Sequence, residues 1–390
     1  MMDYEKILSD KCKEIKPSGI RKFFDIASIM DDVISLGVGE PDFVTPWHIR
    51  DKGIYSLQKG QTHYTANRGL KELRTEIAAY LTRRFGISYD PLTQTLVTVG
   101  GSEAIDLVFR SVLEPYDEVL IPEPSFVCYQ PLTRLSGGVA VPIVTKAENN
   151  FKITPDELRA AITPKTKILV LPYPNNPTGA IMTRKNLEDI AEVLRDTNIL
   201  VLSDEIYAEL TYGKQHCSIA EIDGMYERTV LVSGFSKAYA MTGWRLGYAC
   251  GHPDIISAMT KVHQYGIMSS PTVAQYAAIE ALKNGDGDIE AMRDEYDGRR
   301  RLIVSGFNDM GLDCFEPEGA FYAFPCIKST GLSSTDFCEK LLYSQKVAVV
   351  PGNAFGSSGE GHIRCSYAYS LDSINEALNR IEAFVKSNKG

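Results

Sequence analysis

The chain has 390 residues, which is long for one ordinary hydrophobic core, so we expect two domains. Its 41 lysines and arginines against 50 aspartates and glutamates give a formal charge of −9, which argues against nucleic acids and anionic membranes as partners. The eight cysteines are scattered without a CxxC pair and the six histidines do not cluster with them, so we expect reduced thiols and no metal site.

The N-terminal stretch MMDYEKILSDKCKEI is polar and charged, and it lacks the apolar core of a signal peptide. No apolar run in the sequence approaches the ~20 residues that a membrane-spanning helix needs. The sequence therefore predicts a cytoplasmic protein.

Between about residues 95 and 250, short apolar runs alternate with amphipathic segments. The runs are rich in Val, Ile and Leu without polar alternation, which is typical of strands covered on both faces. The segments 103–113 and 185–195 place apolar residues on one side and predict helices. This alternation predicts an α/β domain with a largely parallel sheet. The predicted strands are TLVTV (95–99), EVLIP (118–122), VAVPIV (139–144), KILVLPYP (167–174), ILVLSDE (199–205), TVLVSGF (229–235) and RLGYAC (245–250).

The pattern changes near residue 290 and predicts a second, smaller α+β domain. A charged helical pattern over 289–308 is followed by the strand-like pieces GAFYAFP, VAVVPG and HIRCSYA and by a last helix near 371–385. We place the large domain at 46–288 and the small domain at 289–390. Residues 1–45 are expected to pack with the small domain and the active site.

Polar residues that follow the predicted strands are candidates for a site, because ligands of doubly wound sheets bind beyond the carboxyl ends of the strands. Gly-Gly-Ser-Glu (100–103) follows a strand and opens a helix, where backbone N–H groups attract an anion. Each of these segments also has an ordinary structural explanation. The Gly-Gly segment could be a plain connection, Asn-Asn-Pro-Thr-Gly (175–179) a turn, and Asp204 a helix N-cap.

Two cations, Lys237 and Arg245, stand in the otherwise small and aromatic stretch SGFSKAYAMTGWRLGY. Each alone could be a surface cation with a buried stem. A desolvated lysine has a lowered pKa and becomes a nucleophile, and an arginine suits a phosphate. Together with the Gly-Gly turn and Asp204, they predict that Arg245 binds a phosphate and that Lys237 bonds covalently to the molecule that carries it.

These segments resemble the class I and II aminotransferases, enzymes of fold type I that use pyridoxal 5′-phosphate (PLP). The similarity covers nearly the whole chain, with the motifs in the same order. It implies a large domain with a mostly parallel seven-stranded sheet flanked by helices, plus a smaller α+β domain. The motifs are LGVGEPDF (36–43), YTANRGLKELR (64–74), VGGSEA (99–104), PEPSF (122–126), PNNPTG (174–179), SDEIY (203–207), GFSKAYAMTGWRLG (234–247), PEGAFYAF (317–324), PGNAFG (351–356) and IRCSYA (363–368).

The resemblance implies a catalytic or cofactor-binding role for each matching residue. Lys237 would hold PLP as a Schiff base and later move a proton between the substrate Cα and the cofactor. Asp204 would pair with the ring nitrogen, and Tyr207 and Asn176 would bond the phenolic oxygen of the ring. The other implied contacts are Gly101, Ser102, Ser236 and Arg245 with the phosphate, Phe126 with the ring face, and Tyr64 with the phosphate of the partner subunit in a homodimer.

The substrate side of the resemblance is carried by fewer residues. Arg364 would bind the α-carboxylate of the substrate in bidentate fashion, with Asn176 and the Gly39 backbone beside it. Certain aspartate-specific relatives have a lysine at the position of Ser102, so strict aspartate specificity is not favoured. SGIRKF (18–23), VLPYPNNPTG (170–179) and KVHQY (261–265) resemble the N-acetyl-diaminopimelate branch, related to the aspartate and aromatic aminotransferases. Arg21 would then contact a substrate side chain, or it belongs to a solvated basic turn.

The implied activity is amino transfer from an L-amino acid to a 2-oxo acid, often 2-oxoglutarate, by ping-pong chemistry. The motif residues fit equally well a PLP-dependent carbon–sulfur β-lyase similar to cystathionine β-lyase, which expels a β-thiol from the same carbanion. A PLP-sensing regulator is disfavoured, because such proteins carry a basic DNA-binding domain ahead of the family pattern. Here the pattern begins by residue 18 and the chain is acidic.

Overall fold

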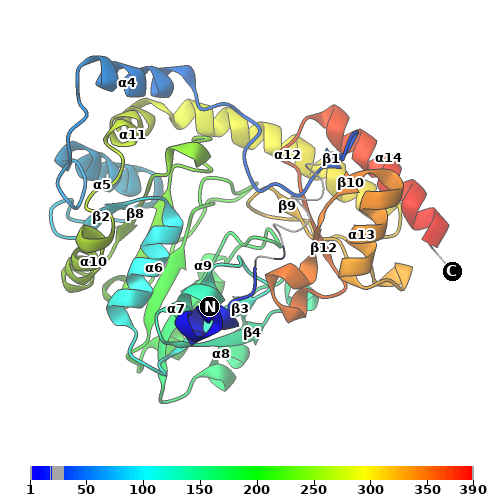
Figure 1. Ribbon diagram of the computed structural model, residues 1–390, viewed down its shortest axis with the longest axis horizontal. Coiled ribbons are helices and arrows are strands. Elements are labelled where there is room, and N and C mark those ends of the chain that lie inside the picture. The colour runs from blue at the N-terminus through cyan, green and yellow to red at the C-terminus, as the bar shows by residue number, and fades with distance from the viewer. Residues whose placement is uncertain (1, 18, 20–29, 389–390) are drawn as a thin grey trace.

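A seven-stranded sheet forms the centre of the computed structural model, which describes residues 2–17, 19 and 30–388 (Figure 1). The strand order is β2-β8-β7-β6-β5-β3-β4. Neighbouring strands from β7 to β4 are parallel, whereas β8 is antiparallel to both β7 and β2. This confirms the predicted, mostly parallel sheet. The strands are β2 (Thr95–Thr98), β3 (Glu118–Glu123), β4 (Val139–Val144), β5 (Thr166–Leu171), β6 (Leu200–Asp204), β7 (Thr229–Gly234) and β8 (Gly247–Cys250).

The strand boundaries differ from the predicted ones where the local backbone prevents pairing. Strand β5 ends at Leu171, because Pro172 and Pro174 have no N–H group to donate to a neighbouring strand. Strand β8 starts at Gly247 rather than at Arg245, because Arg245 adopts a left-handed backbone with φ 53°.

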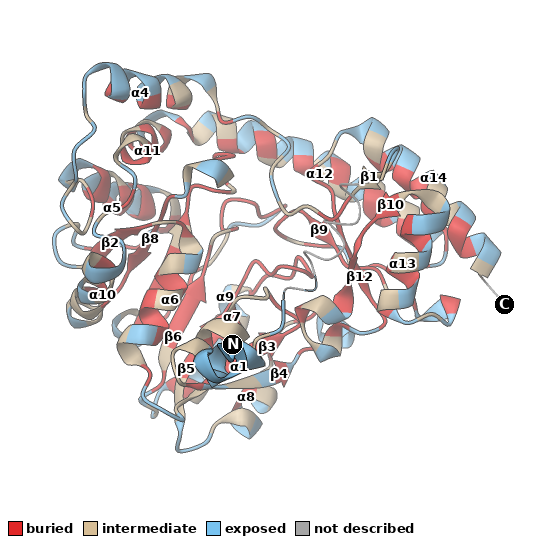
Figure 2. Ribbon diagram, viewed as in Figure 1, coloured by how far each residue is buried: buried red, intermediate tan, exposed pale blue. Residues whose placement is uncertain are grey.

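Helices surround the sheet and form much of the C-terminal part (Figures 1 and 2). In the described ranges, none of them is long and apolar enough to cross a membrane. The helices are α1 (Tyr4–Ile7), α2 (Asp10–Glu14), α4 (Trp47–Gln58), α5 (Lys71–Phe85), α6 (Gly101–Val112), α7 (Tyr129–Leu135), α8 (Pro155–Ala161), α9 (Arg184–Leu194), α10 (Pro253–Gly266), α11 (Thr272–Asn284), α12 (Asp286–Asp309), α13 (Ser334–Gln345) and α14 (Leu371–Asn388). Short 3-10 helices span Ala147–Asn149, Ile219–Glu221, Tyr226–Arg228, Thr242–Trp244, Lys328–Thr330, Gly352–Phe355 and Ser357–Gly359.

The two faces of the sheet carry separate hydrophobic clusters, because successive side chains of a strand point in opposite directions. In β5, Ile168 and Val170 belong to the cluster built with α6 and α10. Leu169 and Leu171 belong to the cluster that includes α8 and α9. Burial on both faces explains why the strands read as continuous apolar runs.

The C-terminal part has its own sheet and its own hydrophobic cluster (Figure 2). Strands β11 (Val350–Pro351), β12 (Ile363–Ser366) and β9 (Tyr322–Ala323) pair in this order and are antiparallel. Strand β1 (Ile34–Ser35) pairs in parallel with β10 (Val347–Ala348), which ties this short segment to the C-terminal part. The long helix α12 leads from the region of α11 to the region of α14 (Figure 1). The domain boundary at residue 288 stays a prediction.

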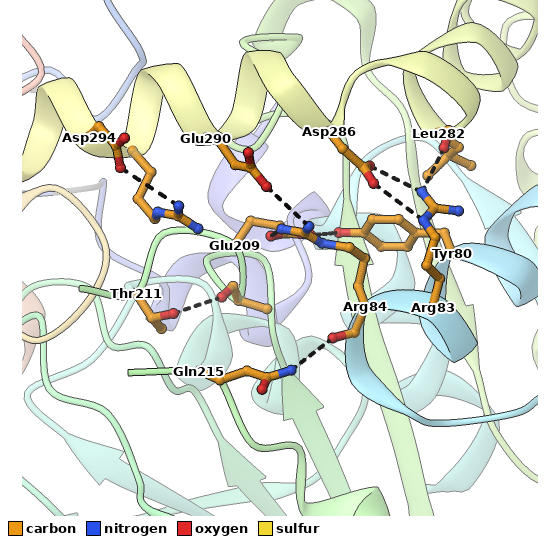
Figure 3. A network of polar contacts seen from close by, with 12 residues as sticks. Tyr80, Arg83, Arg84, Glu209, Thr211, Gln215, Leu282, Asp286, Glu290 and Asp294 are labelled. Carbon is orange, nitrogen blue, oxygen red and sulfur yellow. Dashed lines mark hydrogen bonds and ion pairs between the residues drawn. The ribbon is translucent and has the colours of Figure 1, made fainter. Parts of the chain in front are cut away.

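Helix α5 binds both the segment that follows β6 and the start of α12 (Figure 3). The buried carboxylate of Glu209 accepts hydrogen bonds from Tyr80 Oη at 2.5 Å and from Arg84 Nε and Nη2 at 2.9 and 2.6 Å. The preceding residue of α5, Arg83, pairs with Asp286 at 3.1 Å on the surface. These contacts tie the segment that follows β6 and the start of α12 to helix α5.

We expect Arg84→Met to lower the free energy of unfolding by about 3 kcal/mol, because it leaves the Glu209 carboxylate buried without its cation. Arg83→Met is the matched control, since it breaks an exposed pair on the same helix and should cost less than about 1 kcal/mol. Thermal and urea unfolding of the two variants measure the difference. Equal losses would show that the buried ion pair between Arg84 and Glu209 contributes no more to stability than a surface ion pair.

Candidate active site

One cavity of about 910 Å³ lies beyond the carboxyl ends of the central strands and gathers residues from both parts of the chain. Segment 33–40, the start of α6, the ends of β6 and β7, and strands β9 and β12 all contribute to its wall. Tyr64 does not line this cavity and is 82% exposed. Arg21 lies outside the described residues. The predicted site residues that do line the cavity are Gly39, Gly101, Ser102, Phe126, Asn176, Asp204, Tyr207, Ser236, Lys237, Arg245 and Arg364.

One end of the cavity is suited to an anion. Helix α6 begins at Gly101 with its free N–H groups, and Ser102 and Ser236 line the same end. Gly100 adopts φ 80°, and a Cβ there would lie 2.9 Å from Arg245 Nη2, so glycine allows the guanidinium to approach the helix start. Arg245 also donates to the Thr242 carbonyl at 3.0 Å. The donors here match a phosphate group.

Asp204 is a buried carboxylate at the end of β6. It accepts a hydrogen bond from Tyr129 Oη at 2.7 Å and one from the Ile206 N–H at 3.2 Å. Among the described residues, no cationic side chain pairs with it, and burial raises the pKa of Asp204. A buried carboxylate in this state is suited to a ligand that brings its own positive charge.

Lys237 follows β7, and its amine reaches the cavity wall formed by the N-terminal segment. Its Nζ donates a hydrogen bond to the Gly39 carbonyl at 2.6 Å. Burial lowers the pKa of Lys237 to about 8, against the opposing effect of Glu40, and the charges of Arg364 and Arg245 lower it further. At pH 7 roughly a tenth of this lysine is therefore an uncharged amine, against less than about a thousandth for a lysine with its ordinary pKa of 10.5, and the uncharged form is the one that acts as a nucleophile.

Arg364 on β12 is a guanidinium that is only 2% exposed. Its Nη1 donates to Asn176 Oδ1 at 3.0 Å and its Nη2 donates to the Gly37 carbonyl. The guanidinium carbon lies 4.5 Å from the ring centre of Tyr322 and 4.8 Å from that of Phe355. Nε has no hydrogen-bond partner, and no carboxylate among the described residues pairs with this cation. The site thus provides a buried cation for an anionic substrate group.

Two tyrosines of the site were not predicted from the sequence. Tyr129 lies on α7, three positions after Phe126, and its ring makes an edge-on contact with the Phe126 ring at 6.2 Å. Tyr322 lies on β9, and its hydroxyl is 2.7 Å from that of Tyr207. Because Tyr129 comes only three positions after Phe126, its nearness in the sequence could have indicated that it belongs to the site. The PEGAFYAF motif, in contrast, does not indicate which of its aromatic residues faces the cavity.

Comparison with known proteins agrees with this geometry. The family described as "Aminotransferase class I and II" matches residues 31–381 of the chain. The chain belongs to this family. The probable N-acetyl-LL-diaminopimelate aminotransferase of Bacillus subtilis is 42% identical, over 98% of this chain and 96% of that protein.

An aromatic-amino-acid aminotransferase of Thermococcus litoralis is 45% identical to this class I and II aminotransferase, over 98% of this chain and 99% of that protein. The solved structure of the Thermus thermophilus aspartate aminotransferase with maleate superimposes with a TM-score of 0.93, at 38% identity, over 96% of this chain and 99% of that one. The protein is therefore a PLP-dependent aminotransferase that acts on small amino and oxo acids. These relatives give no support to the carbon–sulfur β-lyase alternative.

Proposed function

We propose that this aminotransferase binds PLP covalently through Lys237 and transfers the amino group of an L-amino acid to a 2-oxo acid, with 2-oxoglutarate as acceptor, by ping-pong chemistry. The observation that carries the proposal is a pair of buried charges, Asp204 and Arg364, that have no ionic partner in the described part of the chain and share one cavity with a lysine of lowered pKa. Such charges are costly unless a ligand compensates them. A cofactor with a cationic ring nitrogen and a substrate with a carboxylate would compensate both.

The residues at the cofactor end would hold PLP in place. When bound, PLP accepts the electron pair that is released as the substrate Cα–H bond breaks. Asp204 would keep the ring nitrogen protonated, and Tyr207 would donate to the phenolic oxygen. Asn176 and the ring of Phe126 would complete the contacts with the ring. The phosphate would be bound by the N–H groups of Gly101 and Ser102, the Ser236 hydroxyl and the Arg245 guanidinium.

Lys237 would have a second task after it binds the cofactor. As a free amine in the cavity wall, its Nζ would move a proton between the substrate Cα and the cofactor. Arg364 would hold the substrate α-carboxylate, with Asn176 beside it and the backbone of Gly39 next to the amine. A substrate held in this way would present its Cα–H bond to the Lys237 amine.

The lowered pKa of Lys237 predicts how cofactor-free protein captures PLP at different pH values. Below a pH of about 8 the amine is protonated and slow to react, so the capture rate should rise with pH and level off just above this value. A lysine with its ordinary pKa of 10.5 would still gain reactivity at pH 10. Stopped-flow absorbance of the capture reaction measures the profile. A rate that continues to rise to pH 10 would contradict the lowered pKa.

The donor amino acid is to be found by experiment. The relatives reported above include enzymes named for aromatic, aspartate and N-acetyl-diaminopimelate substrates. We propose a half-reaction panel, in which each candidate amino acid is mixed with the PLP-loaded protein and the loss of its visible absorbance is followed. Recovery of the absorbance on addition of 2-oxoglutarate tests the acceptor. A protein that no amino acid converts would refute the proposed function.

We also propose that the enzyme is a homodimer in which Tyr64 reaches the phosphate site of the partner subunit. Tyr64 is 82% exposed, and exposed apolar side chains occur along α4 and at the end of α10. The segment that carries Tyr64 lies beside the residues that follow α10, since Asn67 Nδ2 donates to the Met268 carbonyl at 2.8 Å. Sedimentation at twice the mass of one chain would support the dimer. The exposed apolar residues are Val44, Trp47, Ile54, Tyr55, Leu57, Tyr64, Tyr265, Ile267 and Met268.

A cytoplasmic location remains part of the proposal. The eight cysteines are free thiols in the structure, and four of them are buried. Free thiols of this number are typical of proteins from reducing compartments. Fractionation of cells that express the protein tests the location.

A further inference from the structure

Tyr322 occupies a position that links the two ends of the active site. Its hydroxyl is 2.7 Å from the Tyr207 hydroxyl, and its ring lies under the Arg364 guanidinium at 4.5 Å. The side chain is only 1% exposed, and β9 holds it directly beside β12, with Tyr322 paired to Ser366. A Cβ at position 39 would lie 2.5 Å from the Tyr322 hydroxyl, so Gly39 leaves room for it. One side chain thus contacts the predicted cofactor-binding tyrosine and the predicted carboxylate-binding arginine.

The direction of the hydrogen bond between the two tyrosines decides what Tyr207 can do. A phenolic hydroxyl carries one proton, so in a pair of tyrosines one donates and the other accepts. If Tyr207 donates to Tyr322, its only proton is turned away from any ligand. If Tyr322 donates, the Tyr207 proton is free to point into the cavity. No other described residue forms a hydrogen bond with either hydroxyl.

The surrounding charges favour Tyr322 as the donor. The Arg364 cation lies over the Tyr322 ring and withdraws electron density from its hydroxyl. Burial is the main cause that raises the pKa of both tyrosines, and the pKa of Tyr207, which the neighbouring Tyr322 also raises, is raised more strongly. Arg364 lowers the pKa of both, and it is the main opposing influence on Tyr322. Asp204 raises the pKa of Tyr207 further, and the Lys237 Nζ lies 5.8 Å from the Tyr207 ring centre, farther than the 4.5 Å between Arg364 and the Tyr322 ring centre. The more acidic hydroxyl of the pair is therefore that of Tyr322, and the more acidic hydroxyl donates.

We propose that Tyr322 is a positioning residue: its hydroxyl donates to Tyr207 Oη and so directs the single Tyr207 proton toward the bound cofactor, while its ring supports Arg364. This inference rests on the proposed function, because it takes the cofactor to bind beside Tyr207. Hydrogen bonds in a chain strengthen one another, so the donation from Tyr322 makes Tyr207 a stronger donor to the ring oxygen. The substrate carboxylate on Arg364 and the cofactor oxygen beside Tyr207 would then be connected through one phenol.

Tyr322→Phe tests the hydroxyl and keeps the ring. The readout is the pH midpoint at which the absorbance of the bound cofactor changes. A donor to the ring oxygen stabilises the form that has lost its proton, so a weaker donor should raise the midpoint, by about half a pH unit. The KM for the amino acid should stay within about twofold, because the ring still lies under Arg364. Tyr322→Ala should raise the midpoint as well and increase KM about tenfold, because the ring is lost too.

Tyr367→Phe is the matched control, since Tyr367 is a buried tyrosine of the same hydrophobic cluster whose hydroxyl donates to the Ala320 carbonyl at 3.1 Å. It should leave the midpoint unchanged. An unshifted midpoint in Tyr322→Phe, or an equal shift in Tyr367→Phe, would overturn the inference. Wild-type protein in which borohydride fails to fix the cofactor on Lys237 would instead refute the proposed function, so the two failures can be told apart.

Discussion

Lys237→Ala should bind PLP without a covalent bond and lose amino-transfer activity by about 10⁴-fold or more. General acid–base catalysis by a positioned group contributes 10²- to 10⁴-fold, and here the same amine also forms the covalent link, so both contributions disappear together. The amine is well placed for both tasks, because its Nζ lies at the cavity wall, 2.6 Å from the Gly39 carbonyl, and has a pKa of about 8. Single-turnover absorbance with an amino acid and mass spectrometry after borohydride reduction measure the two losses.

The control for this variant is Lys185→Ala, which removes an exposed lysine of α9 that does not line the cavity. It should retain full activity and keep the reduced cofactor on Lys237. A Lys237→Ala variant that still turns over amino acids, or reduced protein that carries its label on another lysine, would show that the wrong amine was chosen.

The central sheet could be predicted because its strands are buried on both faces. Leu169 and Val170 belong to different clusters, and both are fully buried, so the run that contains them shows no polar alternation. The antiparallel direction of β8 could not be predicted. It depends on the chain reversal around Arg245, whose left-handed backbone is unusual for a non-glycine residue and leaves no signal in an apolar pattern.

The site was predictable where a functional residue directly follows a strand. Asp204 is the last residue of β6 and Lys237 comes three residues after β7, and parallel neighbours bring their ends together, so chain order alone indicates one site. Tyr322 comes from the separate small sheet, and its place in the cavity depends on how the two parts of the chain pack. The motif that contains it resembles the family without showing which of its aromatic residues turns inward. Arg21 lies outside the described residues, and its suggested substrate contact stays a prediction.

Asp204→Asn should reduce the rate of amino transfer by about 10³-fold and leave the fold intact. The amide has nearly the same shape and can still accept the Tyr129 hydrogen bond, which is 2.7 Å long in the wild-type protein. It lacks the negative charge, however, and removing one partner of a buried charge pair typically costs 3–5 kcal/mol, or about 10²- to 10⁴-fold. Tyr129→Phe is the matched control, because it removes one hydrogen bond to the carboxylate and keeps the charge. We expect it to cost about tenfold at most.

The stability of the Asp204→Asn protein separates a functional role of this carboxylate from a structural one. Burial raises the pKa of Asp204 in the folded protein, so the ionised carboxylate opposes folding at neutral pH when no cation compensates it. The cofactor-free variant should therefore melt at the same temperature as the cofactor-free wild type, or at a higher one. A cofactor analogue methylated on the ring nitrogen, which is permanently cationic, should restore part of the lost rate. A variant that melts at a clearly lower temperature and gains nothing from the analogue would show that Asp204 serves the fold rather than the ring nitrogen.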